Sequence, residues 1–207
     1  MAIFLLVRHA IADAPLDVLL GRSEVGLSND GIQSARKLAR YLRILPIVAV
    51  WSSPLLRARQ TAQAIADELM LPVGISLALN EVDYGQWTGR SLGELQNDSN
   101  WRDFNRLRTR VQIPAGETIR AVERRVIDQL NGWTKSDQAQ LIVAVTHAEI
   151  IRIAILRCLG LSSDDFDRIE ISHACVSVLQ WVEPRSQLIC LNESGELAAL
   201  RFVLHLA

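Results

Sequence analysis

The sequence is poor in cysteine, has no excess of charge of either sign and contains no long apolar run. Its three cysteines, Cys158, Cys175 and Cys190, are odd in number, lack C-x-x-C spacing and lie among aliphatic residues. We therefore expect buried, reduced thiols rather than a disulfide or a metal site. Lys and Arg residues number 22 against 23 Asp and Glu residues, and the resulting net charge of -1 offers no general field for nucleic acid or an anionic membrane. An anionic ligand must be held by a local cluster of charges.

Segments typical of membrane or exported proteins are also lacking. No stretch reaches the roughly 18 unbroken apolar residues of a membrane-spanning helix, and the short apolar N-terminus has neither a basic leader nor a small-residue cleavage pattern. These absences favour a soluble, cytoplasmic protein. Repeats, low-complexity tracts and linkers are absent as well, and 207 residues suffice for one substantial core. We expect a single domain spanning residues 1–207.

What the sequence does contain is a regular alternation of apolar strands and amphipathic helices. Continuous apolar runs predict buried strands, and apolar residues spaced by three and four predict helices. Strands are expected at 3–9, 48–53, 73–79, 140–147, 175–181 and 187–193, and helices at 27–45, 53–71, 116–133 and 148–160. The predicted fold class is α/β, a three-layer α/β/α sandwich whose mostly parallel central sheet has an antiparallel edge formed by its last strands.

Local signals refine two of these helices and one connection. Ser53 is expected to be the N-cap of the helix at 53–71, with Pro54 at its first position. Gly160 is expected to close the helix at 148–160. The region at roughly 80–114 is polar, contains tryptophan and is long for a structureless connection, so we expect a functional excursion that covers the active site.

Polar side chains follow the predicted strands at the end where open α/β sheets bind ligands. Arg8 and His9 end the first strand, His147 ends the strand "LIVAVTH", and Arg57 follows "VAVWSS" at the start of a helix. Neighbouring parallel strands would bring both imidazoles and both guanidiniums together. Arginine forks match phosphate oxygens, and a helix N-terminus adds backbone donors and a positive dipole end. The sequence therefore predicts a phosphoryl-binding pocket.

Six motifs, in order from residue 5 to about residue 155, carry a family resemblance. They are "LLVRHA", "LSNDGIQSARKLARYL", "VWSSPLLRARQTAQAIA", "LNEVDYGQWTGRS", "PAGETIRAVERRV" and "IVAVTHAEIIRIAI". Together they resemble the R-H-G, G-x-x-Q-A, S-S-x-L-x-R-A-x-x-T-A, E-x-x-x-G-x-W-x-G, G-G-E-S and V-x-H-G-G-x-I-R segments of the histidine phosphatase superfamily. The similarity is to its phosphoglycerate-mutase-like phosphatases.

The resemblance implies a role for each matched residue. His9 would be the nucleophile that accepts the phosphoryl group, and Arg8, Arg57 and His147 would form the phosphate pocket. Glu81 would be the general acid that protonates the leaving alcohol and then activates water. The cationic pocket would replace a metal, and no cofactor is implied.

Other polar and aromatic residues receive weaker or structural interpretations. Arg22 is retained as a further substrate contact, whereas His173 and His205 are interpreted as structural. The tryptophans Trp87, Trp101 and Trp133 are expected to pack the fold. A set of arginines could line a mouth for anionic substrates, although a run of arginines on one stretch is usually a solvated face; besides Arg22, these are Arg90, Arg102, Arg106, Arg108 and Arg110. Taken alone, each histidine could be a packed residue and Glu81 a loop carboxylate paired with an arginine.

Several positions depart from the family pattern: besides Ala148 in place of the first Gly after His147 and a loop at 12–26 that lacks the usual Asn, three departures bear on the pocket. Ala10 stands in place of Gly, Ile11 in place of an acidic residue, and Glu149 falls where a second Gly is usual. The Ala10 methyl is expected to narrow the pocket or to require negative φ, and Glu149 is expected to place a negative charge near an anion site. These departures predict modest turnover or an unusual substrate.

The function predicted is that of a metal-independent phosphatase that hydrolyses a small phosphorylated metabolite through a phosphohistidine on His9. A phosphoglycerate-type mutase is the first alternative, although those relatives are longer and carry an extended insertion. A phosphohistidine-protein phosphatase is another, although its compact members lack the segment containing Glu81. A regulatory protein that binds phosphate without turnover is the third. The oligomeric state is left open.

Overall fold

A single mixed β-sheet forms the centre of the molecule. The computed structural model describes residues 2–134, 140–182 and 184–195. The strands are β1 (Ala2–Arg8), β2 (Ala49–Ser52), β3 (Val73–Ile75), β4 (Gln140–Thr146), β5 (Val176–Trp181) and β6 (Gln187–Glu193). Their order is β3-β2-β4-β1-β5-β6. The first four strands pair in parallel, and β5 and β6 add an antiparallel edge. The predicted α/β fold class is confirmed.

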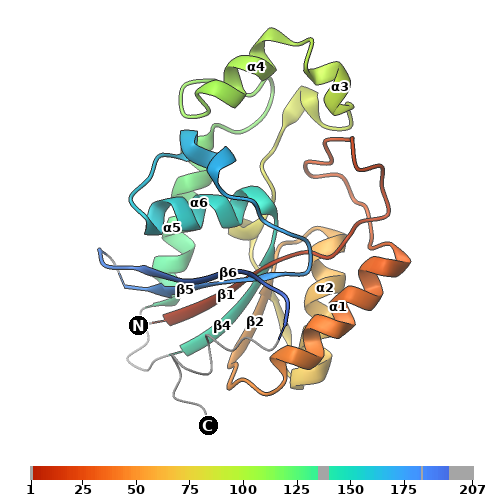
Figure 1. Ribbon diagram of the computed structural model, residues 1–207, viewed down its shortest axis with the longest axis vertical. Helices are drawn as coiled ribbons and strands as arrows, with labels where there is room; N and C mark the ends of the chain where they lie inside the picture. Colours follow the sequence, from red (N-terminus) through yellow and green to blue (C-terminus); the bar gives the residue numbers. More distant parts are fainter. Residues whose placement is uncertain (1, 135–139, 183, 196–207) are drawn as a thin grey trace.

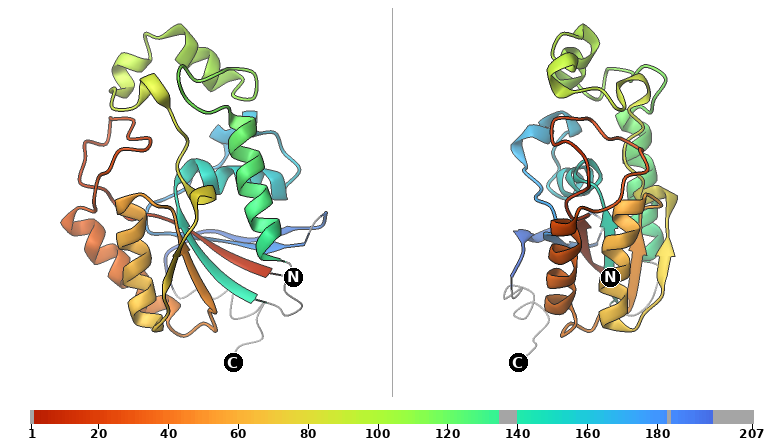
Figure 2. Two further views of the ribbon diagram at one scale, coloured as in Figure 1. Left: turned by 180° about the vertical axis from the view of Figure 1, so that it is seen from behind. Right: turned by 90° about the vertical axis from the view of Figure 1, so that its right-hand side faces the viewer.

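Helices cover both faces of this sheet. Helices α1 (Asn29–Leu42) and α2 (Leu56–Leu69) lie on one side, and α5 (Ile119–Trp133) and α6 (Ala148–Cys158) lie on the other (Figure 1). The short helices α3 (Leu92–Leu95) and α4 (Ser99–Arg106) lie beyond the end of the sheet, as the two further views also show (Figure 2). Three 3-10 helices complete the described helices: η1 (Leu77–Leu79), η2 (Gly85–Trp87) and η3 (Ser163–Arg168). No described helix has the length and apolar character needed to cross a membrane.

Strand β1 divides its side chains between two hydrophobic cores. Phe4 and Leu6 belong to the core formed with α5 and α6, whereas Leu5 and Val7 belong to the core formed with α1 and α2. Successive side chains of a strand point to opposite faces of its sheet. A continuous apolar run is therefore what a strand covered on both faces requires.

Several predicted elements are shorter in the structure, and two of them differ in a way that matters for the site. Helix α2 begins at Leu56 with Leu55 as its N-cap, so the expectations that Ser53 caps it and that Pro54 is its first residue are wrong. The Ser53 amide instead donates to the Val145 carbonyl at 2.9 Å, which continues the pairing with β4, and its hydroxyl lies 2.8 Å from His147 Nε2. The strand predicted at 73–79 ends at Ile75, after which the chain turns into η1.

The excursion at roughly 80–114 contains η2, α3 and α4 and is built around aromatic side chains. Trp87 and Trp101 meet edge to face with ring centroids 5.2 Å apart, and Phe104 packs against both. Trp87 and Trp101 are buried, as their predicted packing role requires. Trp133 packs from α5 against Phe4 and Trp51. The aromatic cluster joins this segment to the hydrophobic core that β1 forms with α5 and α6.

The three cysteines and the end of α6 also agree in part with the expectations from the sequence. Cys158, Cys175 and Cys190 are free thiols, as expected, but they are half-buried rather than buried. Gly160 has a φ of +68° just after α6, so the expected helix end is confirmed. His205 lies outside the described residues.

Candidate active site

The register of β1 and β4 brings His9 and His147 together. Arg8 pairs with Thr146 in parallel, and the His9 amide donates to the Thr146 carbonyl at 2.9 Å. The imidazole centroids of His9 and His147 lie 5.1 Å apart. Both rings are buried. The two strand ends therefore meet as their positions in the sequence predict.

Arg57, in the first turn of α2, joins the two imidazoles. Its Nε donates to His9 Nε2 at 3.2 Å, and its Nη2 lies 3.4 Å from His147 Nδ1. The same guanidinium donates to the carbonyls of Ser23 at 2.9 Å and Gly21 at 2.7 Å. Arg57 is only 1% exposed. These backbone acceptors fix the direction of the guanidinium at the floor of the site.

The surroundings of His9 select the tautomer that a nucleophile needs. Nδ1 lies 2.7 Å from the carbonyl oxygen of Ala10, which can only accept, so Nδ1 carries the hydrogen and Nε2 carries the lone pair. Burial and the Arg57 guanidinium hold the pKa of His9 well below its usual range. His9 is therefore neutral, with Nε2 free of a proton, at ordinary pH.

Arg8 contributes the second guanidinium of the pocket. Its Nη1 donates to the Ile171 carbonyl at 2.5 Å. Its Nε is buried and has no hydrogen-bond partner among the described residues. An unpaired buried donor is costly in a folded protein. A phosphoryl oxygen is an acceptor that would satisfy it.

Glu81 supplies a carboxyl group beside these cationic and imidazole groups. Its Oε2 lies 3.9 Å from His147 Nδ1, and its Oε1 accepts from the Val82 amide at 2.9 Å. Burial, reinforced by the negative charge of Glu149, raises the pKa of Glu81 to about 7. A carboxyl with such a pKa can both give and take a proton near neutral pH.

Arg22 does not line the described cavity, so its contact with substrate stays a prediction, and its contacts in the structure are with groups beside Glu81. Its Nε donates to the Glu81 carbonyl at 3.0 Å, and its Nη2 lies 2.8 Å from Glu117. Arg125 donates to the same Glu81 carbonyl at 3.2 Å and also pairs with Glu117. The structure therefore assigns Arg22 a positioning role: with Arg125 it holds the main chain that carries the Glu81 side chain.

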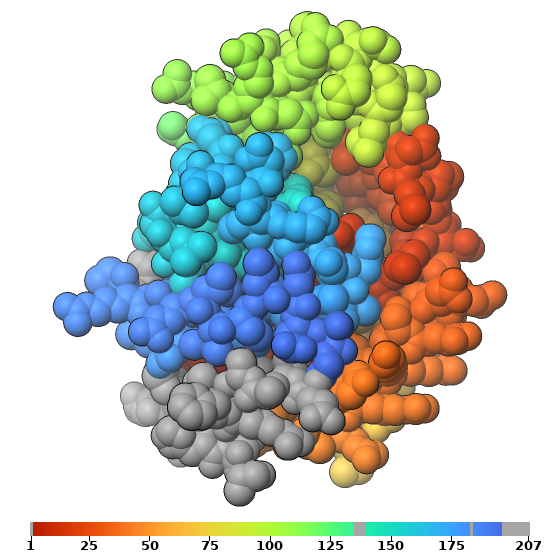
Figure 3. All heavy atoms as spheres, in the orientation of Figure 1, coloured from red at the N-terminus to blue at the C-terminus, as the bar shows by residue number. Residues whose placement is uncertain are grey.

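Arg8, His9, Arg57 and Glu81 line a cavity of about 410 Å³ at the carboxyl ends of the parallel strands, and His147 lies fully buried beside His9 and Arg57 without lining it. Figure 3 shows the surface hollowed where the red N-terminal segment, the green excursion and the blue segment after α6 meet. Several lining residues were not predicted as site residues; they are Tyr84, Trp101, Arg108, Glu149, Arg152, Glu170 and His173. Arg152 is the arginine of the last family motif, "IVAVTHAEIIRIAI", so its position in the motif could have identified it as a site residue.

Glu149 does not present an unbalanced negative charge to the cavity. Its carboxylate pairs with Arg108 from the excursion and with Arg152 one turn along α6. Burial alone would raise the pKa of Glu149, but the Arg108 and Arg152 guanidiniums outweigh it and lower that pKa. The expected negative charge therefore lies beside the cavity, where it helps to raise the pKa of Glu81, and Arg108 and Arg152 balance it.

Ala10 is accommodated without distortion. It does not adopt positive φ, and its methyl group packs with Leu27 and Ala35 outside the cavity wall. Its amide donates to Thr61 Oγ1 at 3.1 Å, and Thr61 in turn donates to the Arg57 carbonyl at 2.8 Å. The pocket is therefore not narrowed at this position, and the segment is tied to α2.

His173 lies in the cavity rather than in the core. Its ring centroid is 5.4 Å from that of His9. Burial, Arg8 and Arg57 lower the pKa of His173 to about 4. The structural interpretation of His173 therefore overlooked a neutral imidazole beside the proposed nucleophile, because nothing in "ISHACVSV" marks its position in space.

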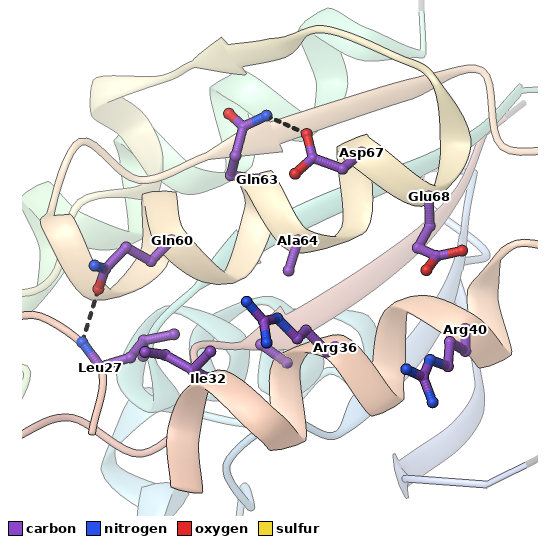
Figure 4. A pocket seen from close by; sticks show the side chains of 10 residues that line it. Leu27, Ile32, Arg36, Arg40, Gln60, Gln63, Ala64, Asp67 and Glu68 are labelled. Atoms are coloured by element: carbon purple, nitrogen blue, oxygen red, sulfur yellow. Dashed lines mark hydrogen bonds between the residues drawn. The ribbon is translucent and has the colours of Figure 1, made fainter. Parts of the chain in front are cut away.

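A larger hollow of about 600 Å³ lies between α1 and α2 and is separate from this site. Its wall carries charged side chains from both helices, including Arg36, Arg40, Asp67 and Glu68 (Figure 4). None of the residues matched to the family roles lines it. Within the described residues, no group of three or more His, Cys, Asp or Glu side chains is arranged to hold a metal ion.

Fold and site together define an α/β protein with a cavity at the carboxyl ends of its parallel strands whose lining includes two arginines, an imidazole and a carboxyl group. The family model of the histidine phosphatase superfamily (branch 1) matches residues 4–194, and the chain belongs to that family. It is 29% identical over 195 residues to phosphoserine phosphatase 1 of Hydrogenobacter thermophilus, covering 93% of this chain and 92% of the relative. It is 28% identical over 195 residues to the adenosylcobalamin/alpha-ribazole phosphatase of Escherichia coli, covering 90% and 94%.

A solved structure agrees with this assignment. The crystal structure of a putative alpha-ribazole-5'-P phosphatase from Escherichia coli superimposes with a TM-score of 0.84 at 25% identity, covering 94% of this chain and 97% of that one. Because these relatives are named phosphatases, they support hydrolysis of phosphoric monoesters by this chain.

Proposed function

We propose that this protein is a phosphatase that hydrolyses a small phosphorylated metabolite through a phosphohistidine at His9 Nε2, in the cytoplasm. One observation carries the proposal: the Ala10 carbonyl holds His9 in the tautomer whose Nε2 lone pair lies against the Arg57 guanidinium in the cavity. The excursion at roughly 80–114 is proposed to cover this site, since Tyr84, Trp101 and Arg108 from it line the cavity. The relatives named above act on phosphoserine and alpha-ribazole phosphate, which supports a small substrate.

The first half of the reaction forms the nitrogen–phosphorus bond. A phosphoryl oxygen competes for the Arg57 Nε hydrogen, which frees the His9 Nε2 lone pair to attack phosphorus in line with the ester oxygen. Arg8 and Arg57 hold the phosphoryl oxygens as charge spreads over them, and neutral His147 joins them as a donor in the tautomer that carries its hydrogen on Nδ1 while the Ser53 hydroxyl donates to Nε2. The ester oxygen–phosphorus bond breaks, and the proton of Glu81 goes to the departing alkoxide.

The second half returns the enzyme to its starting state. Glu81, now a carboxylate, takes a proton from a water molecule whose oxygen attacks phosphorus. The nitrogen–phosphorus bond breaks, inorganic phosphate leaves, and Glu81 is again protonated. The raised pKa of Glu81 suits both steps, because neither form is strongly favoured near neutral pH.

The nucleophile is tested with p-nitrophenyl phosphate. We expect hydrolysis that persists in EDTA, and denaturation during turnover should trap acid-labile phosphate on the enzyme. His9→Ala should lower kcat by about 10⁴-fold or more and trap no phosphate. Hydrolysis by His9→Ala at the wild-type rate would refute the assignment. A wild-type protein that binds phosphate without hydrolysing any ester would instead be a phosphate-binding regulator.

Arg57 offers a test with a matched control two residues away. Arg57→Ala should lower kcat/KM by about 10²-fold or more, because it removes donors from the transition state. Arg59→Ala removes an exposed guanidinium from the same helix and should leave kcat/KM unchanged. Equal losses in both variants would contradict the pocket.

A further inference from the structure

Beyond the groups that would hold phosphate, the cavity wall is largely apolar. Ile11, Leu16 and Leu20 contribute from the segment after His9, and Leu92 and Trp101 contribute from α3 and α4. Leu16 is 85% exposed and Leu92 is 39% exposed, so this apolar surface continues to the mouth of the cavity. At about 410 Å³ the cavity is of the size that holds small organic ligands. The leaving group of a phosphomonoester therefore has an apolar surface to contact.

The charged groups in the same wall are engaged with one another. Apart from Arg8, Arg57 and Glu81, the charged lining residues are Arg108, Glu149, Arg152 and Glu170. Glu149 pairs with Arg108 and Arg152, and Arg152 also lies 3.6 Å from Glu170. The Arg108 guanidinium stacks on the rings of Phe104 and Phe166.

This pairing decides which leaving groups fit. An ammonium group would have to draw Glu149 away from its cations or pair with Glu170, whose side chain is 80% exposed and which therefore offers only a weak, solvated partner. A carboxylate would have to draw Arg108 or Arg152 away from Glu149. Each exchange at Glu149 would leave a buried charge unpaired, which is costly. An uncharged leaving group requires no such exchange.

We propose that the preferred substrate is a phosphomonoester whose alcohol is uncharged and carries an apolar group of about the size of an aromatic ring. The inference rests on the proposed phosphatase function. It separates this chain from enzymes that select phosphorylated amino acids, because those substrates carry both an ammonium group and a carboxylate next to the ester.

Three alkyl esters test the proposal without large differences in leaving-group chemistry. Initial rates of phosphate release would be measured for 2-phenylethyl phosphate, ethyl phosphate and O-phospho-L-serine. We expect kcat/KM for 2-phenylethyl phosphate to exceed both others by about 10-fold or more, because only its ring buries apolar surface in the cavity. Phosphoserine turned over as well as 2-phenylethyl phosphate would overturn the inference.

A pair of leucine variants locates the apolar contact. Leu92→Ser changes the cavity wall and should lower kcat/KM for 2-phenylethyl phosphate by about 5-fold more than kcat/KM for ethyl phosphate. Leu77→Ser is the control, because Leu77 is 74% exposed on η1 and does not line the cavity. Equal losses for both esters in Leu92→Ser would overturn the contact.

The outcomes separate the inference from the function on which it rests. If p-nitrophenyl phosphate and all three alkyl esters remain intact, the phosphatase function itself is wrong. If the esters are hydrolysed with phosphoserine preferred, the function stands and only the apolar specificity is wrong.

Discussion

At the scale of single residues, the protonation of Glu81 sets the pH range of the proposed reaction. Burial and Glu149 raise its pKa to about 7, so the carboxyl is mostly protonated below that pH and mostly ionised above it. Poor leaving groups need the proton most, because an alkoxide is expelled far less readily than a phenolate. If Glu81 is the general acid, hydrolysis of alkyl esters should therefore depend on it more strongly than hydrolysis of aryl esters.

Replacement of Glu81 by glutamine tests this role. For the preferred alkyl ester, wild-type kcat should fall as pH rises through about 7, because the acid form is lost. Glu81→Gln should lower kcat by about 10²-fold or more and remove that descending limb, since an amide has no proton to lose there. Rates from pH 5 to 9 would be compared for the alkyl ester and p-nitrophenyl phosphate. Equal losses for both esters would count against the acid role.

The sequence predicted some of these residues and missed others for a physical reason. Arg8, His9 and His147 follow apolar strands, and parallel pairing alone brings strand ends together, so their meeting could be predicted. Arg108 could not be singled out from the run around it, because its burial depends on Phe166, a residue far along the chain that stacks on it. His173 was missed because its position beside His9 also depends on a contact between residues that are far apart in the sequence.

At the scale of elements, the ion pair of Arg108 with Glu149 joins the excursion to α6. Arg108 follows α4, and Glu149 lies in the first turn of α6. Both side chains are buried. Breaking a buried pair by removing one partner is costly, because the other charge stays desolvated.

A double-mutant cycle measures this link. Glu149→Gln should lower the free energy of unfolding by about 3 kcal/mol, because it leaves both Arg108 and Arg152 without their carboxylate. In an Arg108→Met background the same change should cost about 1 to 2 kcal/mol less. Urea unfolding at pH 7 supplies the four values.

An exposed pair provides the control for the cycle. Arg168→Gln breaks the pair with Asp165, in which the Arg168 side chain is 63% exposed, and should cost less than about 0.5 kcal/mol. Additive effects of the Arg108 and Glu149 substitutions would show that the two elements are not coupled through this pair.

At the scale of the whole molecule, the order of strands and helices was predictable because the apolar runs are long and alternate with amphipathic helices. Phe4 and Leu5 illustrate this, because a strand that is apolar on both faces must lie in the middle layer of a three-layer fold, with helices covering each face. The excursion was predictable as a region but not in its structure. Its packing depends on Trp87, Trp101 and Phe104 meeting at close range, and their spacing in the sequence follows no single period.

The histidines of the cavity make the stability of the whole molecule depend on pH. Burial lowers the pKa of His9, His147 and His173, so below about 6.5 the unfolded chain binds protons that the folded chain excludes. Their contribution to stability is present above that pH and is lost as pH falls. Glu81 acts in the opposite direction, because its pKa is raised and its contribution is lost as pH rises through about 7.

Glu81→Gln therefore isolates the histidines. In this background the free energy of unfolding should fall between pH 7 and pH 5, a window chosen because ordinary carboxylates titrate mainly below it. Adding His173→Asn should reduce that fall by about 1 kcal/mol, a value that allows for the partial solvation of the ring. Urea unfolding at the two pH values provides the measurement. A free energy of unfolding that stays constant or rises toward pH 5 would mean that the imidazoles are protonated in the folded state, and the neutral nucleophile on which the reaction depends would be lost with it.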